Sequence, residues 1–117
     1  MPMTDDPSGA RSPAGYQILL ALSARDRHGY LIRKAVEQQT DGEMRLGPGT
    51  LYAAIRRLED QGLIEESPWR PDADLDDRRR RYYRLTKSGR AALLAETERL
   101  HATVKAALKQ LKMRPAR

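Results

Sequence analysis

The segment 46–64, LGPGTLYAAIRRLEDQGLI, most constrains the fold because it encodes a short helix with its own start and stop. Gly47 suits the N-cap, and Pro48 suits the first helical position, where a missing N–H costs nothing. Gly62 lies where a left-handed residue ends a helix. Apolar side chains at i, i+4 and i+7 predict one buried stripe, which comprises Leu51, Ile55 and Leu58.

The opposite face of this predicted helix carries small and basic side chains, namely Gly49, Thr50, Ala53, Arg56 and Arg57. A small surface with two adjacent arginines suits entry into a DNA major groove, where arginine reaches bases or phosphates. The free N–H groups of the first turn also favour an anion such as phosphate. The segment alone is equally compatible with an ordinary surface helix whose arginines are solvated.

Two short extended segments follow this helix. The run from Leu63 to Glu66 and the run 81–85 (RYYRL) predict two antiparallel strands, joined by a polar, proline-interrupted loop over 70–80. A helix, a turn, a second helix with a basic face and a hairpin form the plan of a winged helix-turn-helix. In that plan the second helix enters the major groove, and the hairpin loop (the wing) approaches the DNA backbone.

The predicted wing holds the densest basic run of the chain, Arg78, Arg79, Arg80 and Arg81. In a wing these side chains could neutralise phosphates. The same loop also holds four acidic residues, Asp72, Asp74, Asp76 and Asp77. The sequence leaves open whether the arginines contact DNA or pair locally with these carboxylates.

Apolar spacing predicts the rest of the DNA-binding domain. Residues 14–24 are apolar almost all round, which predicts a buried helix, and residues 29–40 carry one apolar stripe, which predicts a second helix. Residues 25–28 are a polar turn between them. Residues 1–13 contain three prolines among small and polar residues, which predicts a disordered N-terminal arm. We therefore expect a mainly α (α+β) winged helix-turn-helix domain over 14–86, with a two-stranded wing.

A long final helix is predicted over 87–112, with Thr86 as its N-cap and a flexible tail over 113–117. Its apolar residues are spaced by four and three in alternation, which is a heptad seam. Because the core of such a domain is already closed, we expect this seam to pair with a second copy of the chain. The alternative is a helix that lies on its own domain. The predicted dimer interface comprises Leu93, Thr97, Leu100, Val104, Ala107, Leu108 and Leu111.

The net charge of +6 invites a nucleic-acid interpretation, but its location weakens that argument. Residues 1–98 hold all 16 acidic residues and 16 of the 22 basic residues, and 16 − 16 = 0, so the excess lies within 99–117. The DNA interpretation therefore rests on which residues share a face. The chain has no cysteine, which fits a reducing compartment, and no apolar run of the roughly 18 residues that a membrane span needs. We expect a cytoplasmic protein.

The residues favour no enzyme. The sequence offers no metal-ligand spacing and no cluster of histidine, serine and aspartate, and the segment 47–50 lacks the Gly-Lys-Ser/Thr ending of a phosphate loop. We therefore expect no catalytic residue, no metal site and no cofactor. The serious alternative is a winged-helix module that binds protein instead of DNA. That function would require apolar residues on the exposed face of the 48–61 helix and no basic wing.

Five short blocks occur in one order along the chain: HGY (28–30), LGPGTLY (46–52), RLE (57–59), GLI (62–64) and RRYYRLT (80–86), the last followed by Gly89. As a set, these blocks resemble the PadR family of bacterial transcriptional regulators, over about residues 14–111. The single long C-terminal helix resembles the small members of that family. The resemblance implies a homodimer that binds double-stranded operator DNA, usually a repressor relieved by a small molecule or a stress signal. A two-fold dimer would bind a pseudo-palindromic operator.

The resemblance also implies that Tyr52 contacts the DNA backbone, whereas the residues alone leave packing against the first helix open. The predicted DNA-binding residues are Gly49, Thr50, Tyr52, Ala53, Arg56, Arg57, Arg78, Arg79 and Arg80. His28 is interpreted as a cap or packing residue, and Gly29 as a helix-start position where small size matters. Trp69 is expected to pack at the base of the wing.

Overall fold

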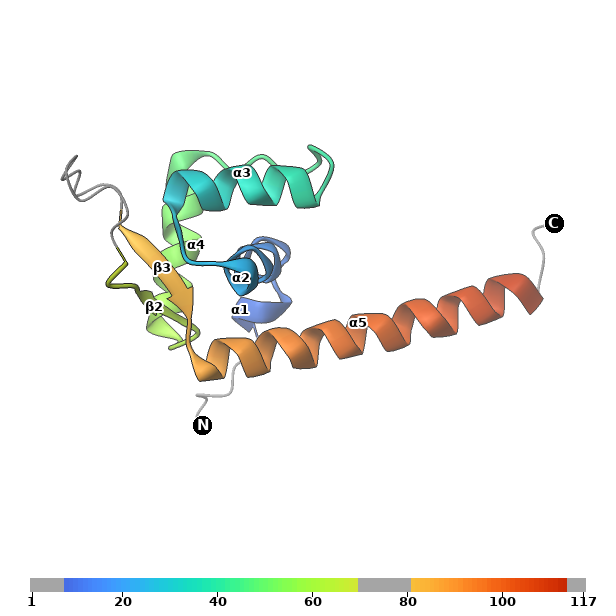
Figure 1. The fold of residues 1–117 in the computed structure, drawn as a ribbon. Helices are drawn as coiled ribbons and strands as arrows, with labels where there is room; N and C mark the ends of the chain where they lie inside the picture. Colours follow the sequence, from blue (N-terminus) through green and yellow to red (C-terminus); the bar gives the residue numbers. More distant parts are fainter. Residues whose placement is uncertain (1–7, 70–80, 114–117) are drawn as a thin grey trace.

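The computed structural model describes residues 8–69 and 81–113 of the chain. A bundle of helices packs beside a small antiparallel sheet, and one long helix leaves the sheet and extends past the bundle (Figure 1). The mainly helical fold class is confirmed. The elements are α1 (Ser8–Arg11), α2 (Pro13–Ala24), β1 (Arg27–His28), α3 (Gly29–Gln39), α4 (Pro48–Asp60), β2 (Ile64–Glu66), β3 (Tyr82–Leu85) and α5 (Lys87–Met113). None of the helices in these two ranges is long and apolar enough to cross a membrane.

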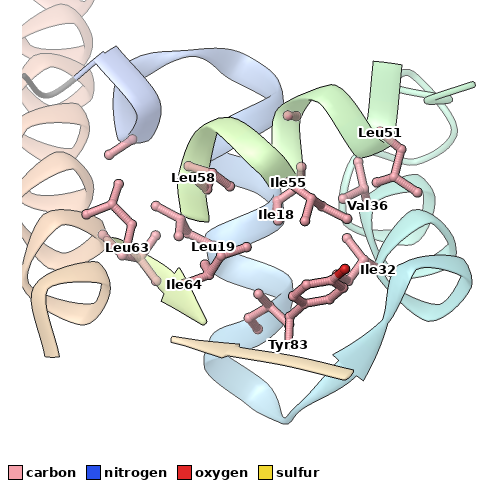
Figure 2. Close-up of a cluster of buried hydrophobic side chains, with 14 of the residues drawn as sticks. Ile18, Leu19, Ile32, Val36, Leu51, Ile55, Leu58, Leu63, Ile64 and Tyr83 are labelled. Carbon is pink, nitrogen blue, oxygen red and sulfur yellow. The ribbon is translucent and has the colours of Figure 1, made fainter. Parts of the chain in front are cut away.

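The core forms around α2, which is buried on more than one side as its sequence predicts. Ile18 and Leu19 are fully buried and are surrounded by apolar side chains of α3 and α4 (Figure 2). The predicted stripe of α4 is confirmed, because Leu51, Ile55 and Leu58 are all buried. Burying each of these side chains stabilises the fold by roughly 1.5–3 kcal/mol. The helix-turn-helix pair α3–α4 is therefore held against α2 through its apolar faces.

Helix α4 begins and ends where its local signals place it. Gly47 is the N-cap and Pro48 is the first helical residue. Gly62 has φ of +74°, and the N–H of Leu63 donates to the carbonyl of Leu58 at 3.0 Å. This left-handed termination is the glycine cap that the sequence predicts.

The sheet has three strands in the order β1-β3-β2. The predicted pair of antiparallel strands is present as β2 and β3, and the sequence missed the third strand, β1. Residues 27–28, expected as part of a polar turn, form β1, in which Arg27 lies opposite Tyr83 and His28 opposite Tyr82. A two-residue strand is too short to show an alternating pattern, so only its partner reveals it. The predicted wing loop 70–80, with Arg78, Arg79 and Arg80, lies outside the described residues.

The predicted disordered arm is wrong for residues 8–13, while residues 1–7 lie outside the described residues. Helix α1 packs against α2, α4 and α5, and Gly9 and Ala10 are buried. The Ser12 hydroxyl donates to the Gly9 carbonyl at 3.1 Å and accepts from the Gly15 N–H at 3.0 Å. Ser12 and Pro13 are therefore the N-cap and first residue of α2. The small residues that suggested disorder allow close packing instead.

Helix α5 begins at the cap that the sequence predicts and runs one residue further than expected, to Met113. The Thr86 hydroxyl accepts from the Gly89 N–H at 3.0 Å and donates to the Gly62 carbonyl at 2.6 Å. A Cβ added at Gly89 would lie 1.9 Å from the carbonyl oxygen of Leu63, so only glycine fits there. The start of α5 is thus joined directly to the end of α4.

The two halves of α5 have different surroundings. Leu93, predicted in the dimer interface, is 7% exposed and belongs to the domain's own core, so its assignment to a free seam is wrong. The Thr97 hydroxyl is hydrogen-bonded to the Tyr16 hydroxyl of α2 at 2.7 Å. From Glu98 to Met113 every residue is exposed. The alternative of a helix lying on its own domain therefore describes the first half of α5 and not the second.

Candidate nucleic-acid interface

The exposed face of α4 carries all five small and basic residues that the sequence places there. Each of these residues is exposed in the structure: Gly49, Thr50, Ala53, Arg56 and Arg57. Their exposure is confirmed, and their contact with DNA stays a prediction.

Small residues occupy the centre of this face, and the arginines flank it. At about 100° per residue, Gly49 and Ala53 lie along one line of the helix, with Arg56 and Arg57 on opposite sides of that line. A Cβ added at Gly49 would meet no atom within 4 Å, so the helix surface is open there. Within residues 8–69 and 81–113, neither arginine forms an ion pair. The face therefore offers a close approach to the helix backbone and two available guanidinium groups.

Tyr52 joins this face to the start of α3. Its side chain is 43% exposed, and its ring lies over Gly29. A Cβ added at Gly29 would lie 2.6 Å from the Tyr52 hydroxyl oxygen and 3.0 Å from Cζ. Tyr52 thus packs on the first residue of α3, whereas the sequence left open packing against the first predicted helix. A larger residue at position 29 would require the Tyr52 ring to shift, which agrees with the expectation that small size matters there.

A row of rings runs from the start of α3 across the sheet to the end of β2. His28 Nδ1 accepts from the Leu31 N–H at 3.4 Å, which confirms His28 as a cap of α3. Its ring stacks on Tyr30, with centroids 6.3 Å apart, and meets the edge of Tyr82 at 5.1 Å. Trp69 meets Tyr82 edge-on at 5.1 Å, as expected for a residue at the wing's base. These contacts fix the position of α3 relative to the sheet.

Ser67 ties the end of β2 to the turn before β1, and sequence reasoning missed it. The buried Ser67 hydroxyl donates to the Asp26 carboxylate and accepts from the Trp69 N–H at 3.1 Å. The Ser67 N–H donates to the Tyr82 carbonyl at 2.7 Å. A serine before a proline signals only a local turn. No sequence signal connects Ser67 with a carboxylate 41 residues away.

The ionisable groups near this surface supply charge and hydrogen bonds. Burial, with a smaller contribution from Glu59, raises the pKa of the Tyr83 hydroxyl, so this phenol is neutral at pH 7. Arg84 pairs with Glu65 across the sheet at 2.9 Å, and both side chains are exposed. An exposed pair of this kind contributes about 0–1 kcal/mol. No group of three potential metal ligands occurs among the described residues.

Comparison with known proteins agrees with this architecture. Residues 18–95 match the transcriptional regulator PadR-like family. A transcriptional regulator of Mycobacterium tuberculosis, Rv3488, is 38% identical over 74 residues, which are 63% of this chain and 52% of that protein. This chain therefore spans about half the length of that curated relative.

Two solved structures share both fold and sequence similarity. A PadR family transcription regulator from Clostridium difficile has a TM-score of 0.70 and 26% identity, over 86% of this chain and 99% of that one. A transcriptional regulator from Clostridium thermocellum has a TM-score of 0.64 and 30% identity, over 90% of this chain and 96% of that one. Members of the matched family are DNA-binding transcriptional regulators rather than enzymes. The chain belongs to the PadR-like family of transcriptional regulators.

Proposed function

We propose that this protein is a homodimeric repressor that binds a specific operator through α4. The observation that carries the proposal is the exposed face of α4, where Arg56 and Arg57 flank a line of small residues without an ion-pair partner among the described residues. Small residues let the helix approach the base edges of a major groove, and arginine is the commonest reader of guanine. Tyr52, which packs on Gly29, would contact the flanking DNA backbone.

The second half of α5 supports the homodimer. Leu100, Val104, Leu108 and Leu111 expose 37%, 55%, 50% and 68% of their surface, and they continue the line of Leu93 along one face of the helix. Exposed apolar stripes of this kind mark an interface, and a second copy of the chain presents a matching stripe. A two-fold dimer would place two α4 helices in successive major grooves, about 34–36 Å apart, on a pseudo-palindromic operator.

A winged-helix module that binds protein is the other function that the sequence left open. It would require large apolar residues on the exposed face of α4. Tyr52 is the single large ring there, and the other side chains of that face are small or charged. This composition favours DNA. Release by a small-molecule effector is part of the proposal on the strength of family membership alone.

In vitro selection from a pool of random-sequence duplexes tests the proposed function. We expect the purified chain to enrich one pseudo-palindromic sequence, and this sequence, placed before a reporter gene, to reduce expression when the protein is present. Arg56→Ala should weaken binding of the selected duplex by about 1–3 kcal/mol and relax the preference at one position of each half-site. Arg90→Ala, at an exposed position of α5, is the matched control and should leave binding unchanged.

Three results would contradict the proposal. The first is a selection that enriches no sequence. The second is an equal and sequence-independent loss of affinity in Arg56→Ala and Arg90→Ala. The third is saturation at one chain per isolated half-site, with no gain in affinity from the second half-site.

A further inference from the structure

Tyr30, the second residue of α3, is an exposed ring held in a fixed place. It exposes 57% of its surface, more than Tyr52 or Trp69. Its ring stacks on His28 with an interplanar angle of 23°, and His28 is itself fixed by its cap on α3 and its edge contact with Tyr82. The Tyr30 ring contributes nothing to the core cluster. Its hydroxyl is therefore presented to solvent by an ordered support.

Lys34, one helical turn later, adds a positive charge to this ring. Its Nζ lies 5.6 Å from the centroid of the Tyr30 ring, which is within the range of a cation–π contact. Lys34 is exposed, and no described carboxylate forms an ion pair with it. Glu37 is the acidic residue of α3 nearest in sequence, and it forms no ion pair with Lys34. Tyr30 and Lys34 together thus present a hydroxyl donor and an ammonium group.

This pair is continuous with the exposed face of α4. Tyr52, which lies one turn before Arg56, packs on Gly29, the residue directly before Tyr30. The exposed surface therefore passes from α4 over Tyr52 to the start of α3. In a helix-turn-helix the first helix crosses the DNA backbone while the second lies in the groove. Helix α3 is that first helix in this chain.

We propose that Tyr30 and Lys34 form a second DNA contact, made to phosphodiester groups beside the base pairs that α4 reads. The Tyr30 hydroxyl donates a hydrogen bond to a phosphate oxygen, and the Lys34 ammonium neutralises the same stretch of backbone. Contacts of this kind fix the register of a protein on the duplex and carry no sequence preference. This inference rests on the proposed function, because it places α4 in a major groove.

The salt dependence of binding tests the inference. Affinity for the selected duplex and for a random-sequence duplex is measured by fluorescence anisotropy at several NaCl concentrations. Lys34→Gln should weaken binding to both duplexes by the same factor. It should also reduce the slope of log affinity against log salt concentration by about 0.9 for each copy bound. Tyr30→Phe, which removes only the hydroxyl, should weaken binding roughly two- to tenfold per copy with little change of slope. Lys87→Gln, at the start of α5 and the opposite end of β3 from Tyr82, removes the same charge and should leave the slope unchanged.

Equal slopes for Lys34→Gln and Lys87→Gln, with full affinity in Tyr30→Phe, would overturn the inference. A change of sequence preference in Lys34→Gln would also overturn it, because a backbone contact carries none. If Arg56→Ala still weakens the selected duplex in those cases, the proposed function stands and only the second contact fails. If the unaltered chain does not bind DNA, or if Arg56→Ala has no effect on binding, the result counts against the proposed function itself. Tyr30, Lys34 and Lys87 are all exposed, so the three substitutions should leave the fold intact. An unchanged thermal unfolding temperature checks that each variant is folded.

Discussion

Helix α5 is one continuous helix, but its first half packs against the domain and its second half is exposed. Its first half, residues 87–97, is attached to the domain at three points: Gly89 packs on the Leu63 carbonyl, Leu93 lies in the core, and Glu96 forms an ion pair with Arg11 of α1. Its second half extends past the bundle and is exposed throughout (Figure 1). The same heptad spacing runs through both halves. A periodic stripe thus identifies which residues need burial, and it does not identify the surface that buries them.

The charges of α5 divide at the same place. Glu96 is buried and paired, whereas Lys105, Lys109 and Lys112 are exposed and have no acidic residue after Glu98 on the helix. Four of the six basic residues that follow Glu98, namely Arg99, Lys105, Lys109 and Lys112, therefore lie on the proposed dimer half and not on the α4 face. The bulk charge and the DNA surface are separate properties of this protein.

The largest expected effect comes from placing a charge in the exposed stripe. Leu100→Asp should convert a dimer into a monomer, because pairing would bury an unpaired carboxylate from each copy. Operator affinity should then fall towards that of a half-site, because the two α4 helices are no longer linked. Sedimentation at micromolar concentration measures the first effect, and anisotropy with the selected duplex measures the second.

Ala102→Asp is the matched control, because Ala102 is exposed on the opposite side of α5 from the stripe. It should remain dimeric with unchanged affinity. A Leu100→Asp variant that stays dimeric with full operator affinity would show that the second half of α5 is not the dimer interface.

Truncation of one leucine in each half separates the two environments. In the monomeric Leu100→Asp background, Leu93→Ala should lower the free energy of unfolding by about 2–5 kcal/mol, because it leaves a cavity in the core. Leu111 lies about five turns later on the same line of the helix and is exposed. Leu111→Ala should therefore change the free energy of unfolding by less than about 0.5 kcal/mol. Urea denaturation measures both. Equal losses at the two positions would mean that the halves do not differ in their attachment to the domain.

A smaller, pH-dependent effect is expected at Glu96. Its hydrogen bond from Arg99, reinforced by the charges of Arg99 and Arg11, lowers the pKa of the Glu96 carboxyl in the folded state. The resulting stabilisation is complete above the ordinary glutamate pKa of about 4.3 and is lost as the pH falls through the lowered value. Glu96→Gln should therefore unfold at a lower temperature than the unaltered chain at pH 7. The difference between the two unfolding temperatures, measured by thermal denaturation, should disappear as the pH falls through the lowered pKa.

Glu98→Gln provides the comparison for Glu96→Gln, since Glu98 is exposed two residues further along α5. Its effect on thermal unfolding should be small at every pH. A gap for Glu96→Gln that keeps its size in acid would rule out the carboxylate's charge as the source of the stabilisation.

The parts of the fold that the sequence predicts are those with local signals. Helix α4 has a glycine cap, a proline start and a glycine stop within 16 residues, so its ends follow from neighbours in the chain. Strand β1 and helix α1 are too short for a pattern and exist because distant segments pack against them. The assignment of Leu93 to the dimer interface is wrong for a related reason. Its spacing shows that it needs burial but does not reveal which surface it contacts.

The candidate site divides in a similar way. The exposed face of α4 follows from helical spacing, so all five of its residues are placed correctly. The contact of Tyr52 with Gly29, the exposed ring of Tyr30 and the bond between Ser67 and Asp26 depend on how separate elements meet. Those contacts set where the face points, and no spacing rule within one element contains them.

The Thr86 hydroxyl bridges the Gly62 carbonyl and the Gly89 N–H, so hydrogen bonds hold the start of α5 against the end of α4. This junction sets the rotation of α5 about its own axis relative to α4. One residue inserted after Gly89 would turn every later side chain of α5, including Leu93 of the core, by about 100° and advance it by about 1.5 Å. The stripe of Leu100 and Val104 would then point in a new direction relative to the groove-reading face. The number of residues between Gly89 and the stripe therefore determines how the proposed dimer interface is oriented relative to α4. A comparison of side chains alone would overlook this requirement.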